Sequence, residues 1–143
     1  MRSLETLLDL FRQNSLKITP QRRAVLAVLV NDDSHPTADE IYRRVVAVMP
    51  DVSRATVYNT LRVLVALDAL IEVRDLSEDS MRYDTNTGTH HHLFCTCCHA
   101  LIDISRDFEG LSLSAEETSG YKIMKRQVTF YGICPTCQSR EED

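Results

Sequence analysis

The stretch HHHLFCTCCH, residues 90–99, contains four of the chain's five histidines and three of its five cysteines. The other two cysteines stand in CPTC, residues 134–137, near the end of the chain. Each stretch holds one C-x-x-C motif, and the motifs consist of Cys95 with Cys98 and of Cys134 with Cys137. An interpretation of the C-terminal half has to account for both motifs together.

Paired C-x-x-C motifs are typical of a structural zinc site. Each motif presents two thiolates on a tight turn, and two such turns complete a closed, tetrahedral four-sulfur site for Zn²⁺. A redox dithiol needs only one pair and a thioredoxin-like context. We therefore predict structural Zn²⁺ on the four motif cysteines. The fifth, Cys97, receives no role.

Length and composition indicate an ordinary globular protein. The 143 residues are 43% hydrophobic and 26% charged, which suffices for one domain or two small ones. No apolar run approaches the roughly 20 residues of a membrane span. Glu5 and Asp9 interrupt the apolar pattern at the N-terminus, unlike in a secretory signal. We expect a cytoplasmic protein without a membrane partner, in which cysteines indicate metal or redox chemistry before disulfides.

The charge of the chain is unevenly distributed. The net charge is −5, which by itself argues against a nucleic-acid partner. Residues 12–62, however, hold eight basic and five acidic residues, a net of +3, whereas residues 84–143 hold five basic and nine acidic residues, a net of −4. The local basic excess allows a nucleic-acid partner for the N-terminal half, although a charged run is usually just a solvated face.

Hydrophobic periodicity predicts four helices in the N-terminal half. The first covers residues 3–14. The second begins at Thr19-Pro20, an N-cap followed by proline at the first helical position. The third opens at TADE, residues 37–40, with Thr37 and Glu40 as a capping box, and Pro50 ends it. The fourth follows Ser53 as N-cap.

The fourth helix has two contrasting faces. Its apolar face consists of Val57, Leu61 and Leu64, and its polar face consists of Arg54, Tyr58 and Arg62 with Asn59 beside them. Such a polar face fits a recognition helix in a DNA major groove, and it also fits an ordinary surface helix.

A hairpin after the fourth helix favours the interpretation as a recognition helix. LIEVRD, residues 70–75, and MRYD, residues 81–84, are strand-like runs joined by the turn-forming SEDS, residues 77–80. Helices followed by such a hairpin predict a winged helix.

The histidine run suggests a second metal site. In a strand, His90 and His92 point to one face and His91 to the other. An H-x-H pair needs at least two more ligands, and Asp84 and Asp103 are the candidates nearby. His35, before Pro36, is by itself more often a loop residue than a ligand. His91 and His99 receive no role.

Taken together, these motifs resemble the ferric uptake regulator (Fur) family over nearly the whole chain. The resemblance rests on KITPQR (17–22), SHPTADEIY (34–42), SRATVYNTLRVL (53–64), RYD (82–84), HHH-x-x-C-x-x-C (90–98) and the final C-x-x-C. It implies an α+β protein with an N-terminal winged-helix DNA-binding domain, residues 1–83, and a C-terminal α/β metal-binding dimerisation domain, residues 84–143.

The resemblance also implies ligands and partners. The structural zinc falls on Cys95, Cys98, Cys134 and Cys137, and a regulatory Fe²⁺ or Mn²⁺ site falls on His35, Asp84, His90, His92 and Asp103. The partner is double-stranded DNA with an inverted-repeat operator, bound by a homodimer. We expect DNA contacts from Lys17, Arg54, Thr56, Tyr58, Asn59 and Arg62, with Lys17 in the minor groove.

The regulatory donor set resembles the peroxide-sensing (PerR) branch. Three imidazoles and two carboxylates without a thiolate suit Fe²⁺ or Mn²⁺, and iron-uptake regulators more often carry glutamate where this chain has Asp84 and Asp103. The resemblance implies a repressor in which peroxide and iron oxidise His35 or His90. A further sensor site of the family is not expected, because Lys125 and Arg126 stand where a histidine is usual.

Two other functions compete with this one. A Fur-type iron- or manganese-responsive repressor without peroxide sensing differs by little more than glutamate in place of aspartate. A hydrolytic metal centre is disfavoured, because no aspartate completes an H-x-H-x-D motif and no general base is evident. We therefore expect a regulator that is not an enzyme and has no organic small-molecule ligand.

Overall fold

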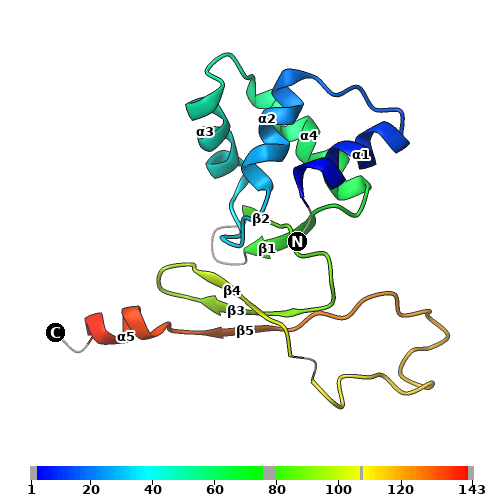
Figure 1. Cartoon of the computed structure of the whole chain (residues 1–143). Coiled ribbons are helices and arrows are strands. Elements are labelled where there is room, and N and C mark those ends of the chain that lie inside the picture. The colour runs from blue at the N-terminus through cyan, green and yellow to red at the C-terminus, as the bar shows by residue number, and fades with distance from the viewer. Residues whose placement is uncertain (1–2, 76–79, 107, 142–143) are drawn as a thin grey trace. The chain divides into compact units, whose positions relative to one another are not determined.

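A computed structural model describes residues 3–75, 80–106 and 108–141 of the chain. The chain divides into two compact units, residues 1–87 and 88–143. The first contains helices and a hairpin, and the second contains a three-stranded sheet and a short helix (Figure 1). The assignment of DNA binding to residues 1–83 and of dimerisation to residues 84–143 stays a prediction.

The elements are α1 (Leu4–Gln13), α2 (Pro20–Leu29), α3 (Ala38–Val48), α4 (Arg54–Ala66), β1 (Ile71–Asp75), β2 (Ser80–Asp84), β3 (His91–Cys95), β4 (Leu101–Ile104), β5 (Thr129–Gly132) and α5 (Pro135–Glu141).

The four predicted helices of the N-terminal unit are confirmed, together with their starts. The N-cap side chains of Thr19 and Ser53 accept hydrogen bonds from the backbone N–H groups of Arg22 and Thr56. Thr37 and Glu40 form the complete capping box at the start of α3. These caps satisfy N–H groups that the first turn of a helix leaves without a partner.

A hydrophobic core joins the helices of the N-terminal unit. Leu8 and Phe11 of α1, Leu26 of α2, Ile41 of α3 and Leu61 of α4 are fully buried in it. The apolar face predicted for the fourth helix is confirmed, because Val57 and Leu64 are buried as well. Burial of this face leaves the opposite side of α4 exposed.

The hairpin β1–β2 completes the winged helix. The strands are antiparallel, from Ile71 opposite Asp84 to Asp75 opposite Ser80. Of the turn predicted at SEDS, residues 77–79 lie outside the described residues. The Tyr83 N–H donates to the carbonyl of Pro36 at 2.9 Å, and a β-bridge joins Thr37 to Arg82. The hairpin is therefore tied to the segment that leads into α3.

The sheet of the C-terminal unit has the order β4-β3-β5. β3 runs antiparallel to β4 and parallel to β5, and a parallel pair requires a long connection. The chain between β4 and β5 makes this connection as a wide excursion (Figure 1), and in its described part, residues 105–106 and 108–128, there is neither helix nor strand. The predicted α+β fold class is confirmed.

Of the helices formed by the described residues, none combines the length and the apolar character that a membrane crossing requires.

Candidate metal centres and DNA-contact surface

The two C-x-x-C motifs lie on turns at the same end of the sheet. Cys95 ends β3, and Cys98 lies in the turn before β4. Cys134 and Cys137 stand at the start of α5, where the N–H of Cys137 donates to the carbonyl of Cys134 at 3.0 Å. The parallel pairing of β3 with β5 sets Cys95 opposite Gly132, so that both turns face one point.

The four sulfur atoms have the geometry of a zinc site. One sulfur atom from each cysteine lies within 4.8 Å of all the others. The Cys98 and Cys134 sulfurs are 3.7 Å apart, and a tetrahedral site with Zn–S bonds of about 2.3 Å separates its sulfurs by about 3.8 Å. All five cysteines are free thiols, so no disulfide competes for the site. The cluster fits Zn²⁺.

Backbone donors favour the thiolate form of one of these cysteines. The N–H groups of Cys98 and Cys134 lower the pKa of Cys95 to about 6, and the Cys134 N–H lies 3.3 Å from its sulfur. The contact with Cys134 raises the pKa of Cys137. Metal binding requires deprotonated thiols, so this arrangement prepares only part of the site in advance.

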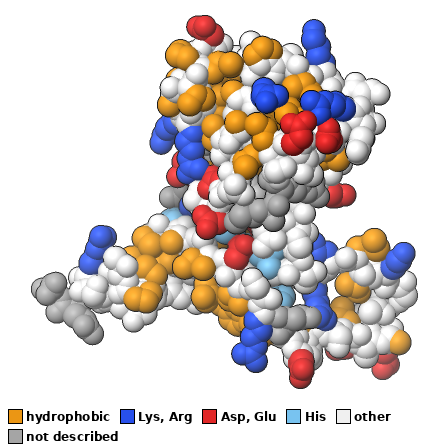
Figure 2. Space-filling view, in the orientation of Figure 1, with side chains coloured by type: hydrophobic (Ala, Val, Ile, Leu, Met, Phe, Trp, Pro, Cys, Tyr) orange, Lys and Arg blue, Asp and Glu red, His pale blue; other side chains and the backbone are white. Residues whose placement is uncertain are grey.

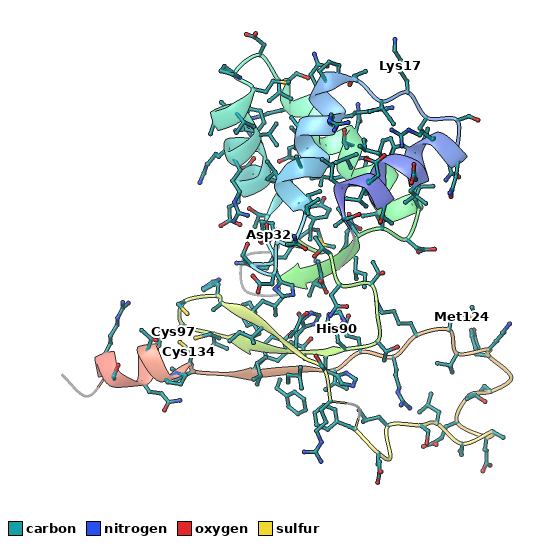
Figure 3. All side chains as sticks on the ribbon, in the orientation of Figure 1. Lys17, Asp32, His90, Cys97, Met124 and Cys134 are labelled. Carbon is teal, nitrogen blue, oxygen red and sulfur yellow. The ribbon has the colours of Figure 1, made fainter. Side chains whose placement is uncertain are left out.

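Cys97 remains outside the cluster. Its side chain is exposed, and it does not belong to the group of sulfurs that surround one point. Cys97 and Cys134 are seen at the end of the sheet next to α5 in Figure 3. The structure thus separates Cys97 from the four motif cysteines.

In the N-terminal unit, two predicted ligands of the second site lie together. His35 stands in the loop between α2 and α3, and Asp84 ends β2. Their side chains are 2% and 3% exposed, and Nε2 of His35 lies 3.8 Å from Oδ1 of Asp84. His35, which stands apart from the other histidines in the sequence, therefore has a carboxylate neighbour from the hairpin.

The loop that carries His35 is held by a network that sequence reasoning missed. The carboxylate of Asp32 accepts hydrogen bonds from the N–H and hydroxyl of Ser34 at 3.0 and 2.6 Å, and from the guanidinium of Arg44 on α3. The hydroxyl of Thr85 donates to the carbonyl of Asp32 at 2.9 Å. Within this loop His35 has a φ of 49°, in the left-handed region that non-glycine residues seldom occupy. Such a backbone outlier persists only where its surroundings hold it.

In the C-terminal unit, the other three predicted ligands converge. The Nε2 atoms of His90 and His92 are 3.0 Å apart. Oδ1 of Asp103 lies 3.6 Å from the first and 3.5 Å from the second. Asp103 reaches this point because β4 places it directly opposite His92.

Two neighbouring groups orient the imidazoles. Nδ1 of His90 lies 2.9 Å from the carbonyl of Gly88, so this nitrogen carries the proton, and Nε2 keeps the lone pair that a metal requires. The side-chain amide of Gln127 lies 3.3 Å from Nδ1 of His92, and when His92 holds a metal through Nε2, the oxygen of this amide has to face Nδ1 and accept its proton. Gln127 was missed in the sequence because it is 35 residues from His92, and no local motif marks it.

His91 points away from this group, as the strand alternation predicted. Its Nδ1 accepts a hydrogen bond from the N–H of Val128 at 3.1 Å, and its ring lies 5.0 Å from that of Phe108. It is completely buried and lies against Phe108.

The donor chemistry of both sets suits the same kind of metal. Imidazole nitrogen and carboxylate oxygen are the donors of Fe²⁺ and Mn²⁺ sites. His90 and His92 offer ring nitrogens oriented by Gly88 and Gln127, and Asp84 and Asp103 offer oxygens. The residues present therefore fit such an ion.

The residues expected to contact DNA are largely exposed. Lys17 projects from the turn ahead of α2 (Figure 3), and Arg54, Asn59 and Arg62 are exposed along α4. Thr56 and Tyr58 are half-buried. An open groove is lined by side chains of the segment that leads into α2, of the first turn of α2 and of α4, namely Lys17, Thr19, Gln21, Arg22, Thr56 and Asn59. Three of the six expected contacts thus line one groove.

Two of the expected contacts are bound to α3. Oδ1 of Asp39 accepts hydrogen bonds from the guanidinium of Arg54 and, at 3.1 Å, from the hydroxyl of Tyr58. The Arg54 guanidinium also lies 4.5 Å from the centre of the Tyr42 ring. The hydrogen bond from Arg54 lowers the pKa of Asp39, and burial raises the pKa of Tyr58. Asp39 was not anticipated from the sequence.

Comparison with known proteins agrees with this combination of a winged helix and two sets of metal donors. The sequence profile described as "Ferric uptake regulator family" matches residues 13–131. The chain belongs to the ferric uptake regulator family.

Relatives within this family carry names that refer to peroxide. The chain is 33% identical over 138 residues to the "Peroxide-responsive repressor PerR" of Staphylococcus aureus, and the match covers 96% of this chain and 93% of that protein. It is 34% identical over 139 residues to the "Peroxide operon regulator" of Bacillus subtilis, and that match covers 96% and 95%.

A solved structure of a similar protein supports the fold. The structure, described as the basis for peroxide sensing and gene regulation by PerR from Streptococcus pyogenes, is 32% identical to this chain. The alignment has a TM-score of 0.56 and covers 96% of this chain and 95% of the other.

Proposed function

We propose that this chain is a metal-dependent, DNA-binding transcriptional repressor that responds to hydrogen peroxide. The observation that carries the proposal is its identity of 33–34% to two proteins named for peroxide response, over more than nine-tenths of each. The nitrogen and oxygen donors described above support it, since they suit redox-active iron.

One ion would take donors from both units. His35 and Asp84 alone provide two ligands, and His90, His92 and Asp103 provide three, so neither set completes a coordination sphere by itself. Only residues 85–89 separate Asp84 from His90 in the chain. A shared ion would favour one arrangement of the two units, which is how metal binding would select the DNA-binding state.

Fe²⁺ held by these histidines and aspartates would supply the redox chemistry that activates hydrogen peroxide beside the ligands, and over the whole reaction the imidazole ring gives up the two electrons that reduce the peroxide. The net change on the protein is the insertion of one peroxide oxygen at a ring C–H of His35 or His90, with release of water. An oxidised ring is a weaker ligand than an imidazole, so the two units would lose their shared tie and DNA would be released. In this proposal each sensing histidine is oxidised once and is not regenerated, so the protein acts as a sensor and not as an enzyme.

The protein would bind an inverted-repeat operator through α4. A helix-turn-helix places its second helix in the major groove, where side chains reach base edges and phosphates. The exposed cations Arg54 and Arg62 and the groove beside Lys17 support this placement.

A homodimer would present two such helices to one operator. Leu93 of β3 pairs with Ile102 of β4 on one side and with Phe130 of β5 on the other, which places three apolar side chains side by side. They are 47%, 55% and 41% exposed. Hydrophobic side chains gather on the surface of the C-terminal unit (Figure 2), and contiguous apolar surface of this kind marks association.

The test compares the same zinc-loaded protein with Fe²⁺ and with Mn²⁺ before and after a stoichiometric pulse of hydrogen peroxide. We expect both metals to support operator binding, and only the iron form to lose it. Mass spectrometry should then find one added oxygen on His35 or His90 in the iron form alone. Intact histidines with DNA still bound after the pulse would instead indicate an iron- or manganese-responsive repressor without peroxide sensing.

A further inference from the structure

The contact between Asp39 and α4 concerns the choice between operator and random DNA. Asp39 lies in the first turn of α3, and a single oxygen of its carboxylate accepts from both Arg54 and Tyr58. Tyr42, one turn further along α3, lies under the Arg54 guanidinium. Arg54 is therefore held from α3 by an ion pair and by a ring.

These two side chains belong to the surface that the proposed function places on DNA. The Arg54 and Asp39 side chains are 58% and 50% exposed, so the pair lies open on this surface. An acidic group is unexpected there, because phosphates repel it. A guanidinium binds carboxylate and phosphate through the same charged hydrogen bonds, so the Asp39 carboxylate makes the kind of bond to Arg54 that a DNA phosphate would make.

We propose that Asp39 is a specificity-determining residue, whose carboxylate competes with DNA for Arg54 and at the same time orients Tyr58 for base contact. The inference rests on the proposed DNA binding by α4. Non-specific binding depends on phosphate contacts alone. On random DNA, Arg54 exchanges the Asp39 carboxylate for a phosphate and leaves Asp39 facing phosphates. Arg54 therefore adds little to the free energy of binding to random DNA.

On the operator, base contacts add to the free energy of binding that the phosphate contacts provide. The hydrogen bond to Asp39 restricts the position of the Tyr58 hydroxyl. An oriented side chain loses less conformational freedom when it meets a base edge. Asp39 therefore lowers the affinity for random DNA more than the affinity for the operator.

The experiment measures binding of the Mn²⁺-loaded, zinc-containing dimer to two duplexes over a range of salt. One is the sequence that the wild type selects from a random pool, and the other is a scrambled duplex of equal length. The variants are Asp39→Asn and, as matched control, Asp51→Asn, which removes the same charge from an exposed site three residues before Arg54.

For Asp39→Asn we expect the ratio of operator to scrambled affinity to fall by about fivefold or more. Binding to scrambled DNA should gain a salt dependence steeper by about one released counterion. Asp51→Asn should raise both affinities by a similar factor and leave their ratio unchanged. In an Arg54→Gln background, the effect of Asp39→Asn on the salt dependence should disappear.

The outcomes separate this inference from the proposed function. A wild type that selects no sequence overturns the proposed function and this inference with it. A wild type that discriminates, with Asp39→Asn indistinguishable from Asp51→Asn, overturns the role of Asp39 alone. The role of Asp39 is also overturned if Asp39→Asn has its full effect on the salt dependence in the Arg54→Gln background. Thermal melting of each variant confirms that the comparison involves folded protein.

Discussion

At the scale of single residues, the cysteines divide into four that form the sulfur cluster and one that lies outside it, a division that the C-x-x-C spacing predicted. Cys95, Cys97 and Cys98 lie within four positions, yet Cys97 alone stays outside the sulfur cluster. We expect Cys95→Ser to lose zinc and to unfold the C-terminal unit, because structural zinc contributes on the order of 10 kcal/mol. Cys97→Ser should keep one zinc per chain. Elemental analysis and thermal melting of both variants provide the measurement, and zinc loss from Cys97→Ser alone would contradict the assignment.

A second prediction at this scale concerns Gln127. Its amide contacts Nδ1 of His92, and loss of such an outer contact typically lowers metal affinity about 10- to 100-fold. We expect Gln127→Ala to weaken Mn²⁺ binding by that factor and to leave the zinc content unchanged. Titration of free Mn²⁺ by electron paramagnetic resonance measures it. Lys125→Ala, at an exposed position two residues away, is the control, and equal affinities in both variants would exclude an orienting role.

At the scale of elements, the loop between α2 and α3 depends on an ion pair with the helix that follows it. The ion pair between Asp32 and Arg44 holds this loop to α3, and His35 keeps its left-handed backbone only within it. We expect Arg44→Gln to lower Mn²⁺ affinity by about fivefold, the effect of losing a partly exposed pair worth about 1 kcal/mol. Isothermal titration calorimetry measures the change. Arg43→Gln, the neighbouring exposed arginine, should bind like the wild type, and a similar loss in both variants would point to net charge instead of loop geometry.

At the scale of the whole molecule, the apolar row on the sheet predicts self-association. A charge placed on Leu93, between Ile102 and Phe130, would have to be desolvated when two copies meet. We expect Leu93→Glu to shift the protein from dimer to monomer at micromolar concentration and to lower operator affinity at least tenfold, because one recognition helix then binds alone. Analytical ultracentrifugation measures the mass. Leu113→Glu is the control, since Leu113 is 57% exposed outside this row. A Leu93→Glu variant that remains dimeric would show that another surface associates.

Local signals in the sequence were sufficient for much of the fold. Thr19-Pro20, the capping box of Thr37 and Glu40, and Ser53 marked three helix starts correctly, because a cap depends on residues only three positions apart. The alternation of the histidine run likewise separated His91 from its neighbours, since successive side chains of a strand face opposite sides.

The sequence by itself determined which residue types were available, with thiolates for zinc, imidazoles and carboxylates for a second ion, and cations on α4. Only the tertiary structure decided which distant groups stand beside them. Asp39 meets Arg54 and Tyr58 because α3 and α4 pack together, and Gln127 reaches His92 because β5 pairs with β3. These contacts arise where separate elements meet, and the physical reason for their absence from the sequence pattern is that periodicity and capping act over a few residues, whereas packing joins residues at any separation.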